Sequence, residues 1–143
     1  MVDAPRLRSL LSGLRARRTE LRSYAERDLD AYISDPQAVH ASKYLLLTSI
    51  EDALSAANHV IASEGYRAPA DYADAFRSLR EAGVLNSALA DRLEAMARFR
   101  NLLIHRYADV DDRRVHQYLQ QDLDDLDAFI AAILDAFPEL GRT

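Results

Sequence analysis

The sequence predicts an all-α protein: an antiparallel helical bundle of four main helices and one short helix, forming a single domain over residues 1–143. Three observations predict this fold. Apolar residues recur at helical spacing along most of the chain, and no stretch shows the alternation of a strand. Only four Gly and four Pro interrupt the pattern. Hydrophobic residues make up 49% of the 143 positions, enough for one core in a domain of this length.

The first two helices are expected on either side of an Asp-Pro pair. An apolar stripe over positions 7–29 predicts a first helical segment of about 30 residues. Asp35 is a favourable N-cap and Pro36 is tolerated in a first helical turn, so the second helix should begin there. Its stripe covers positions 43–61, and Gly65 predicts its end.

Three more helices follow from capping residues and periodicity. A short helix is expected over roughly 71–82, ending at Gly83. Asn86 should cap the fourth helix, whose stripe continues beyond residue 100. The last helix should begin at Asp109 or Asp111. Long amphipathic helices joined by short connections predict the antiparallel bundle.

Composition narrows the class of function. A formal net charge of −5 disfavours non-specific binding of nucleic acid, which requires clustered cations. Six arginines lie in residues 6–22 and five aspartates in residues 119–135, and we interpret both stretches as solvated helix faces. The chain has no cysteine, no apolar run long enough for a membrane span, and no signal-peptide pattern at its start. We therefore expect a cytoplasmic protein with no membrane partner.

The motifs of metal and cofactor sites are missing from the sequence. It contains no Glu-x-x-His and no His-x-x-x-His, and its four glycines stand apart, so it has no phosphate-binding loop. We expect no metal and no cofactor. The histidines His40, His59 and His116 are interpreted as ordinary surface or partly buried residues.

One stretch combines groups suited to phosphodiester chemistry. Residues 100–107 contain Arg100, Asn101, His105 and Tyr107 at the end of the fourth expected helix. Arginine binds phosphate through a planar set of donors, and histidine exchanges protons near neutral pH. Asn101 and His105 are four residues apart and share a helix face, whereas Arg100 and His105 differ by about 140° around the axis.

Two arrangements would bring the arginine and histidine together. The last helical turn could loosen, or a second copy of the chain could supply the complementary set across a two-fold axis. A purely structural role is equally compatible with the spacing: Arg100 would pair with an acid of a neighbouring helix, and His105 would occupy the helix end, where a cation is favoured. Tyr107 would then be an aromatic residue packing against the last helix.

The motif Arg100-x4-His105-x-Tyr107, with Asn101 after the arginine, resembles the signature of HepT-type toxins of the HEPN superfamily. The resemblance extends over about residues 20–133. It includes Ala57-Asn58-His59-Val60-Ile61, Arg67-Ala68-Pro69, Gly83-Val84-Leu85 and Tyr118-Leu119 in order and spacing.

The resemblance implies a dimeric HEPN-like helical bundle that cleaves RNA without metal, with both copies of the motif in a cleft at the dimer interface. Residue by residue, it implies that Arg100 and His105 are catalytic and that Asn101 orients the phosphate. It also implies that the protein is the toxin of a type VII toxin–antitoxin system. The partner would be an MntA-like nucleotidyltransferase antitoxin, which inactivates the toxin by transferring AMP to Tyr107.

Arg98 and Arg106 flank the motif, and we expect them to add positive potential for RNA. An alternative function is a non-catalytic helical module that binds a nucleotidyltransferase and presents itself as the substrate. The RNA target, and association beyond a homodimer, are not predicted by the sequence.

Overall fold

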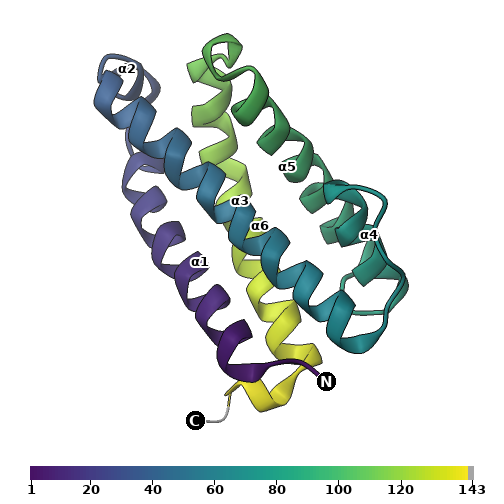
Figure 1. The fold of residues 1–143 in the computed structure, drawn as a ribbon. Coiled ribbons are helices and arrows are strands. Elements are labelled where there is room, and N and C mark those ends of the chain that lie inside the picture. The colour runs from purple at the N-terminus through teal and green to yellow at the C-terminus, as the bar shows by residue number, and fades with distance from the viewer. Residues whose placement is uncertain (142–143) are drawn as a thin grey trace.

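The computed structural model describes residues 1–141, and these form helices connected by short loops (Figure 1). No strand occurs in this part of the chain. The elements, in chain order, are α1 (Ala4–Ala25), α2 (Leu29–Ile33), α3 (Pro36–Glu64), α4 (Tyr72–Glu81), α5 (Ser87–His105), the 3-10 turn η1 (Tyr107–Asp109), α6 (Asp112–Ala136) and the 3-10 turn η2 (Pro138–Gly141). Helices α1, α3, α5 and α6 are the four main helices of the predicted all-α bundle.

The prediction of one continuous first segment was wrong. That segment divides into α1, whose C-cap is Glu26, and the short α2, which Asp28 caps by accepting a hydrogen bond from the Ala31 N–H at 2.8 Å. The apolar stripe continues across the break, so periodicity alone did not reveal it. The α4 helix is the expected short one.

Helix starts in this chain follow one rule. Each of the six α-helices described begins after an Asp or Asn whose side chain accepts a hydrogen bond from a backbone N–H of the first turn. The predicted caps Asp35 and Asn86 are confirmed, and Asp111 rather than Asp109 starts the last helix. Gly65 ends α3 with a φ of 70°, a left-handed conformation that a side chain would strain.

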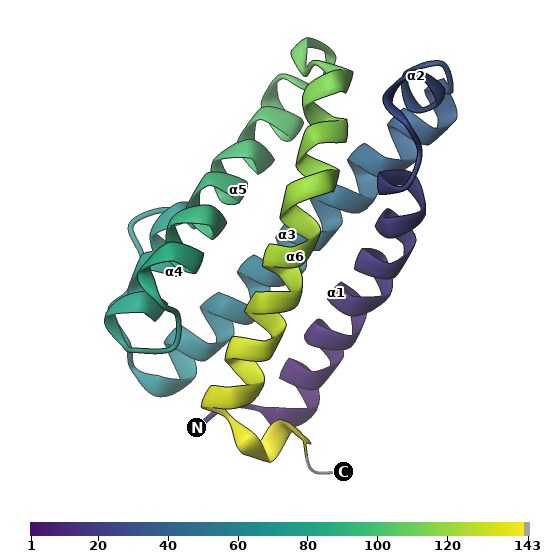
Figure 2. The ribbon, with the colours of Figure 1, turned by 180° about the vertical axis from the view of Figure 1, so that it is seen from behind.

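The central element is α3, which packs against α1, α4, α5 and α6. Figure 1 shows α3 crossing the molecule diagonally, and Figure 2 shows α6 on its opposite side. The aromatic rings of Phe76 and Phe129 meet edge to face at 5.8 Å between centroids, while those of Phe99 and Tyr118 stack at 3.9 Å. These contacts join α4 to α6 and α5 to α6 inside the core.

The two ends of the bundle differ. In both views the end of α5, η1 and the start of α6 lie at the same end as α2 and the start of α3, while both chain termini lie at the other (Figures 1 and 2). The candidate motif is therefore far from the termini and close to the first turns of α3. No helix in residues 1–141 is long and apolar enough to cross a membrane.

The interpretation of the two charged stretches as solvated faces was wrong in part. Arg18 of α1 pairs with Asp127 of α6 at 2.5 Å, and Arg22 lies 3.7 Å from Asp124. Asp122 and Asp125 of the same acidic stretch are buried. The basic helix α1 and the acidic helix α6 pack against each other, so part of each stretch neutralises the other.

Candidate active site

The predicted motif occupies the C-terminal end of α5 and the turn that follows. The helix is continuous to His105, and the Arg106 N–H extends its last turn by donating to the Leu102 carbonyl oxygen at 2.9 Å. The loosened turn that would bring Arg100 and His105 together within one chain is therefore not present. On an intact helix the two side chains point about 140° apart.

Three neighbours fix the orientation of Arg100. Its Nε donates to Glu51 Oε1 of α3 at 2.6 Å, and its Nη1 donates to Asn101 Oδ1 at 3.1 Å. The guanidinium also lies 4.3 Å from the ring centroid of Tyr72 in α4, a cation–π contact. The side chain is only 11% exposed. The predicted pairing with an acid of a neighbouring helix is thus present, and it leaves Nη2 without a hydrogen bond within residues 1–141.

His105 and Asn101 have a more open environment. Both are exposed, and their spacing of four residues places them on one face of α5. His105 makes no hydrogen bond or ion pair in the described part of the chain. It lies in the last helical turn, where the helix dipole favours a cation, but the C-cap position belongs to Arg106.

The two flanking arginines lie in different places. Arg98 is exposed and lines a hollow together with Asn101, and it has no ion-pair partner in residues 1–141. Arg106 is exposed at the helix end, 3.4 Å from Asp109, and lines a different hollow from Arg98. The structure therefore does not bring Arg98 and Arg106 together in one protomer.

Tyr107 packs against α3, whereas the alternative, purely structural interpretation placed its ring against the last helix. Its hydroxyl lies 2.9 Å from His40 Nδ1, and the two rings are nearly parallel, 13° apart, with centroids separated by 6.0 Å. The ammonium of Lys43 lies 4.7 Å from the Tyr107 ring centroid. The tyrosine remains 39% exposed despite these contacts.

Sequence reasoning missed four residues that support the motif: His40, Lys43, Glu51 and Tyr72. One of them had a visible signal. Lys43 is the single lysine among 18 cationic residues, and it lies within the apolar stripe of its helix. It is 5% exposed and pairs with Asp112 of α6 at 2.9 Å. A lone lysine at a core-facing position requires a charged partner, which that carboxylate provides.

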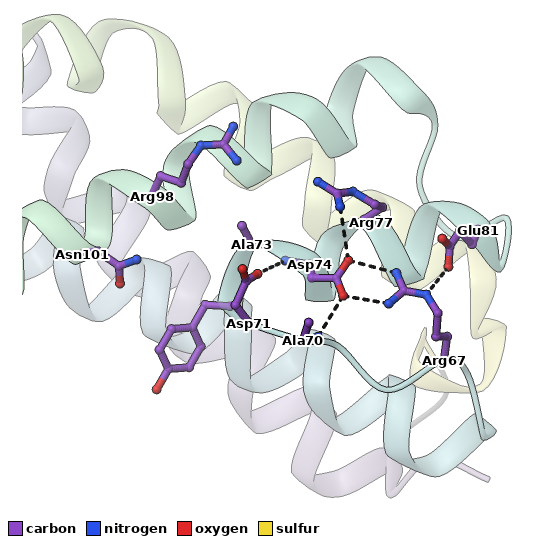
Figure 3. A pocket seen from close by; sticks show the side chains of 10 residues that line it. Arg67, Ala70, Asp71, Ala73, Asp74, Arg77, Glu81, Arg98 and Asn101 are labelled. Atoms are coloured by element: carbon purple, nitrogen blue, oxygen red, sulfur yellow. Dashed lines mark hydrogen bonds and ion pairs between the residues drawn. The ribbon is translucent and has the colours of Figure 1, made fainter.

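A hollow of about 450 Å³ lies beside the motif, between α4 and α5 (Figure 3). Its far side is an ion-pair cluster around Asp74. Arg67 contacts Asp74 at 2.7 and 3.0 Å and Glu81 at 2.6 Å, and Arg77 lies 3.6 Å from Asp74. The Arg67 guanidinium, and then the Ala70 N–H, hold the pKa of the Asp74 carboxyl far below its usual range.

That cluster is structural. Its charges satisfy one another and tie the loop before α4 to the helix, and Ser78 Oγ adds a bond to the Arg67 carbonyl oxygen at 2.6 Å. On the near side of the hollow, Arg98 and Asn101 point from α5 without such partners (Figure 3). Within residues 1–141, no group of three or more His, Cys, Asp or Glu side chains could hold a metal ion.

The family model for HepT-like ribonucleases matches residues 15–133, most of the chain and all of the motif. This protein belongs to the HepT-like ribonuclease family. A candidate RNase of Archaeoglobus fulgidus is 31% identical over 108 residues, which cover 76% of this chain and 81% of that protein.

Solved structures support the HEPN fold of this family. The Shewanella oneidensis HEPN toxin, tri-AMPylated and in complex with an MNT antitoxin, has a TM-score of 0.84 and 21% identity, with 94% of this chain and 99% of that chain covered. The cytosolic protein YutE of Bacillus subtilis, of unknown function, has a TM-score of 0.77 and 21% identity, with 99% and 96% covered. At these identities the likeness shows the fold, and the all-α HEPN bundle predicted from the sequence is confirmed.

Proposed function

We propose that this HepT-like protein is a metal-independent endoribonuclease and the toxin of a type VII toxin–antitoxin system, acting in the cytoplasm. The main observation in support of this proposal is the exposed C-terminal end of α5. There, His105 and Asn101 have no partner outside their own helix within residues 1–141, and they lie next to an arginine whose orientation is fixed. In a member of a ribonuclease family, an arginine–histidine motif at the exposed end of an ordered helix is a candidate for acting on an external substrate.

The chemistry follows from the residue types. Cleavage by attack of an RNA 2′-hydroxyl needs a base to remove its proton and an acid to protonate the departing 5′-oxygen. Histidine serves in both roles, with an effect of about 10²–10⁴-fold. Nη2 of Arg100, which makes no hydrogen bond within residues 1–141, would stabilise the charge that grows on the non-bridging phosphate oxygens. Asn101, bonded to that guanidinium, would donate its amide N–H to the same phosphate.

A second copy of the chain would complete this site. One protomer holds a single His105, directed about 140° away from its own Arg100, so it lacks both a nearby acid–base pair and a convergent cation. A two-fold axis beside the end of α5 would supply the partner's histidine and arginine. We therefore propose a homodimer with a composite active site, with Arg98 and Arg106 of each copy adding positive potential toward RNA.

Regulation is proposed to act on Tyr107. The related Shewanella oneidensis toxin is AMPylated in its complex with an MNT antitoxin. We propose that an MntA-like nucleotidyltransferase antitoxin transfers AMP to Tyr107 of this chain. An AMP group two residues from His105 would place a bulky anion in the cleft, blocking RNA sterically and offsetting the charge of the arginines.

The test is cleavage of RNA by the purified protein in EDTA. We expect the wild type to cut RNA, and His105→Ala and Arg100→Ala each to lower the rate by about 10²-fold or more. His59→Ala is the matched control. His59 accepts a hydrogen bond from the Asp3 N–H near the chain terminus, at the other end of the bundle, and its loss should leave cleavage unchanged.

Two results would reject the proposal that this motif cleaves RNA. Intact RNA with the wild type would favour the alternative, a non-catalytic module that binds a nucleotidyltransferase and serves as its substrate. Equal cleavage by the wild type and both motif variants would place the activity elsewhere. Growth arrest on induced expression, relieved by His105→Ala, would separate a toxin from a harmless module in the cell.

A further inference from the structure

The hydroxyl of Tyr107 has a specific partner. Of the seven tyrosines in the chain, all within the described residues, it is the one whose hydroxyl meets an imidazole nitrogen, His40 Nδ1, at 2.9 Å. The hydroxyl of Tyr32, by contrast, contacts Ser42 Oγ at 2.6 Å inside the core. His40 and Tyr107 are 67 residues apart in sequence, so the fold, and not local chain geometry, brings them together.

The imidazole is positioned to accept a proton from the tyrosine. With its hydrogen on Nε2, His40 presents the Nδ1 lone pair to the Tyr107 hydroxyl, which then donates. His40 is exposed, and it makes no other hydrogen bond within residues 1–141. Its Nε2 edge is therefore free to release a proton to solvent.

Two further charges order the pair. The Lys43 ammonium lies over the Tyr107 ring, while Asp112 holds that ammonium at 2.9 Å. Because Lys43 is nearly buried and paired, the Tyr107 ring lies against a cation whose position is fixed.

We propose that His40 is a catalytic base carried by the toxin itself, which activates Tyr107 for AMP transfer. The inference rests on the proposed function, since it names the residue that makes the modification site reactive. The Tyr107 oxygen attacks the α-phosphorus of ATP, and the new P–O bond forms as the bond to the β-phosphate bridging oxygen breaks. Pyrophosphate leaves, and the phenolic proton passes to His40 Nδ1.

The geometry also explains why Tyr107 would be selected over a more accessible residue. Tyr44 lies on the same helix as His40 and is 65% exposed, against 39% for Tyr107, and it has no imidazole partner in the described chain. Exposure alone would make Tyr44 the preferred site of modification. A base in contact with the Tyr107 hydroxyl would make Tyr107 the preferred site.

A chemical probe tests the activation without any partner protein. N-acetylimidazole acetylates tyrosine hydroxyls, and peptide mapping by mass spectrometry gives the rate at Tyr107 relative to Tyr44 in the same molecule. We expect His40→Asn, which keeps an acceptor near the Nδ1 position but takes up no proton, to lower this ratio about tenfold or more. His59→Asn is the matched control and should leave it unchanged. An unchanged or higher ratio in His40→Asn would overturn the proposal.

AMP transfer by a purified MNT-type nucleotidyltransferase with ATP and Mg²⁺ provides the second measurement. Transfer to Tyr107 that slows about 10²-fold in His40→Asn, but not in His59→Asn, supports the base. Equal transfer to the wild type and His40→Asn overturns it and leaves the proposed regulation intact. Absence of AMP on Tyr107 of the wild type contradicts the proposed regulation, and the acetylation ratio then decides the role of His40 by itself.

Discussion

Two clusters of polar side chains, one around Asp74 and one at the end of α5, differ in how completely their charges are paired. Around Asp74, two arginines, a second carboxylate and a backbone N–H satisfy one another. At the end of α5, Arg100 is held through Nε and Nη1 while its Nη2 makes no hydrogen bond, and His105 has no partner in residues 1–141. A closed ion-pair network stabilises the fold, whereas an ordered but unsatisfied set is available to a substrate or a second protomer. The hollow between α4 and α5 is lined by the ion-pair network on one side and by Arg98 and Asn101 of α5 on the other.

The largest contrast is expected from His105→Ala. Its side chain makes no intramolecular bond, so the free energy of unfolding should change by no more than about 0.5 kcal/mol. RNA cleavage should fall by about 10²–10⁴-fold, because the proposed acid–base group is lost. Urea denaturation and cleavage rates measured on the same preparation check this. If His105→Ala were destabilised but cleaved RNA normally, His105 would have a structural role and not a catalytic one.

The opposite result is expected from Asp74→Ala. This change leaves Arg67 and the Ala70 N–H without their shared acceptor. We expect the free energy of unfolding to fall by about 2–4 kcal/mol. The fraction that remains folded should cleave RNA at the wild-type rate, since no group of the motif is touched. A variant of normal stability would show that this network is not structural.

A smaller effect, dependent on pH, is expected at Asp122 of α6. Burial, and then the neighbouring Asp125, raise its pKa to about 7, and its Oδ2 is buried with no hydrogen-bond partner in the described residues. An unfolded aspartate titrates near 3.9, so between about pH 4 and pH 7 the folded chain binds more protons than the unfolded chain. The free energy of unfolding therefore falls as the pH rises through this window and stays low above it.

Asp122→Asn should remove that penalty. At pH 8 we expect it to raise the free energy of unfolding by about 1–2 kcal/mol, and at pH 4 the gain should be close to zero. Asp124→Asn is the matched control, because that exposed carboxylate has only a distant arginine partner, at 3.7 Å, and should change stability little at either pH. An equal gain in the free energy of unfolding at both pH values would show that the pKa of the Asp122 carboxyl is not raised.

The sequence was sufficient for the architecture and for the location of the motif. Periodicity marked the main helices, and short polar residues marked their starts, because a helix N-terminus requires an acceptor wherever it occurs. Periodicity failed at Asp28, where the stripe continues through a break. The motif could be recognised because its residues lie within eight positions of one another.

The residues of other helices that contact the motif could not be predicted in the same way. His40 and Glu51 come from α3, and their contacts with Tyr107 and Arg100 depend on how that helix crosses α5. A single sequence does not specify the axial register of one helix against another, so neither partner was identifiable. Lys43 is the exception, since a lone lysine in an apolar stripe indicates a buried ion pair.

A shared active site requires the C-terminal ends of α5 from two protomers to lie close together. The distance between spin labels on the two protomers tests this pairing directly. The chain has no cysteine, so Ile104→Cys and Ala88→Cys each give one spin label per protomer, at the motif end and in the first turn of the same helix, about 24 Å apart along its axis. Both positions are exposed. Pulsed electron paramagnetic resonance on the dimer should give a shorter label-to-label distance at position 104 than at position 88. A monomer, or a shorter distance at position 88, would contradict a shared active site.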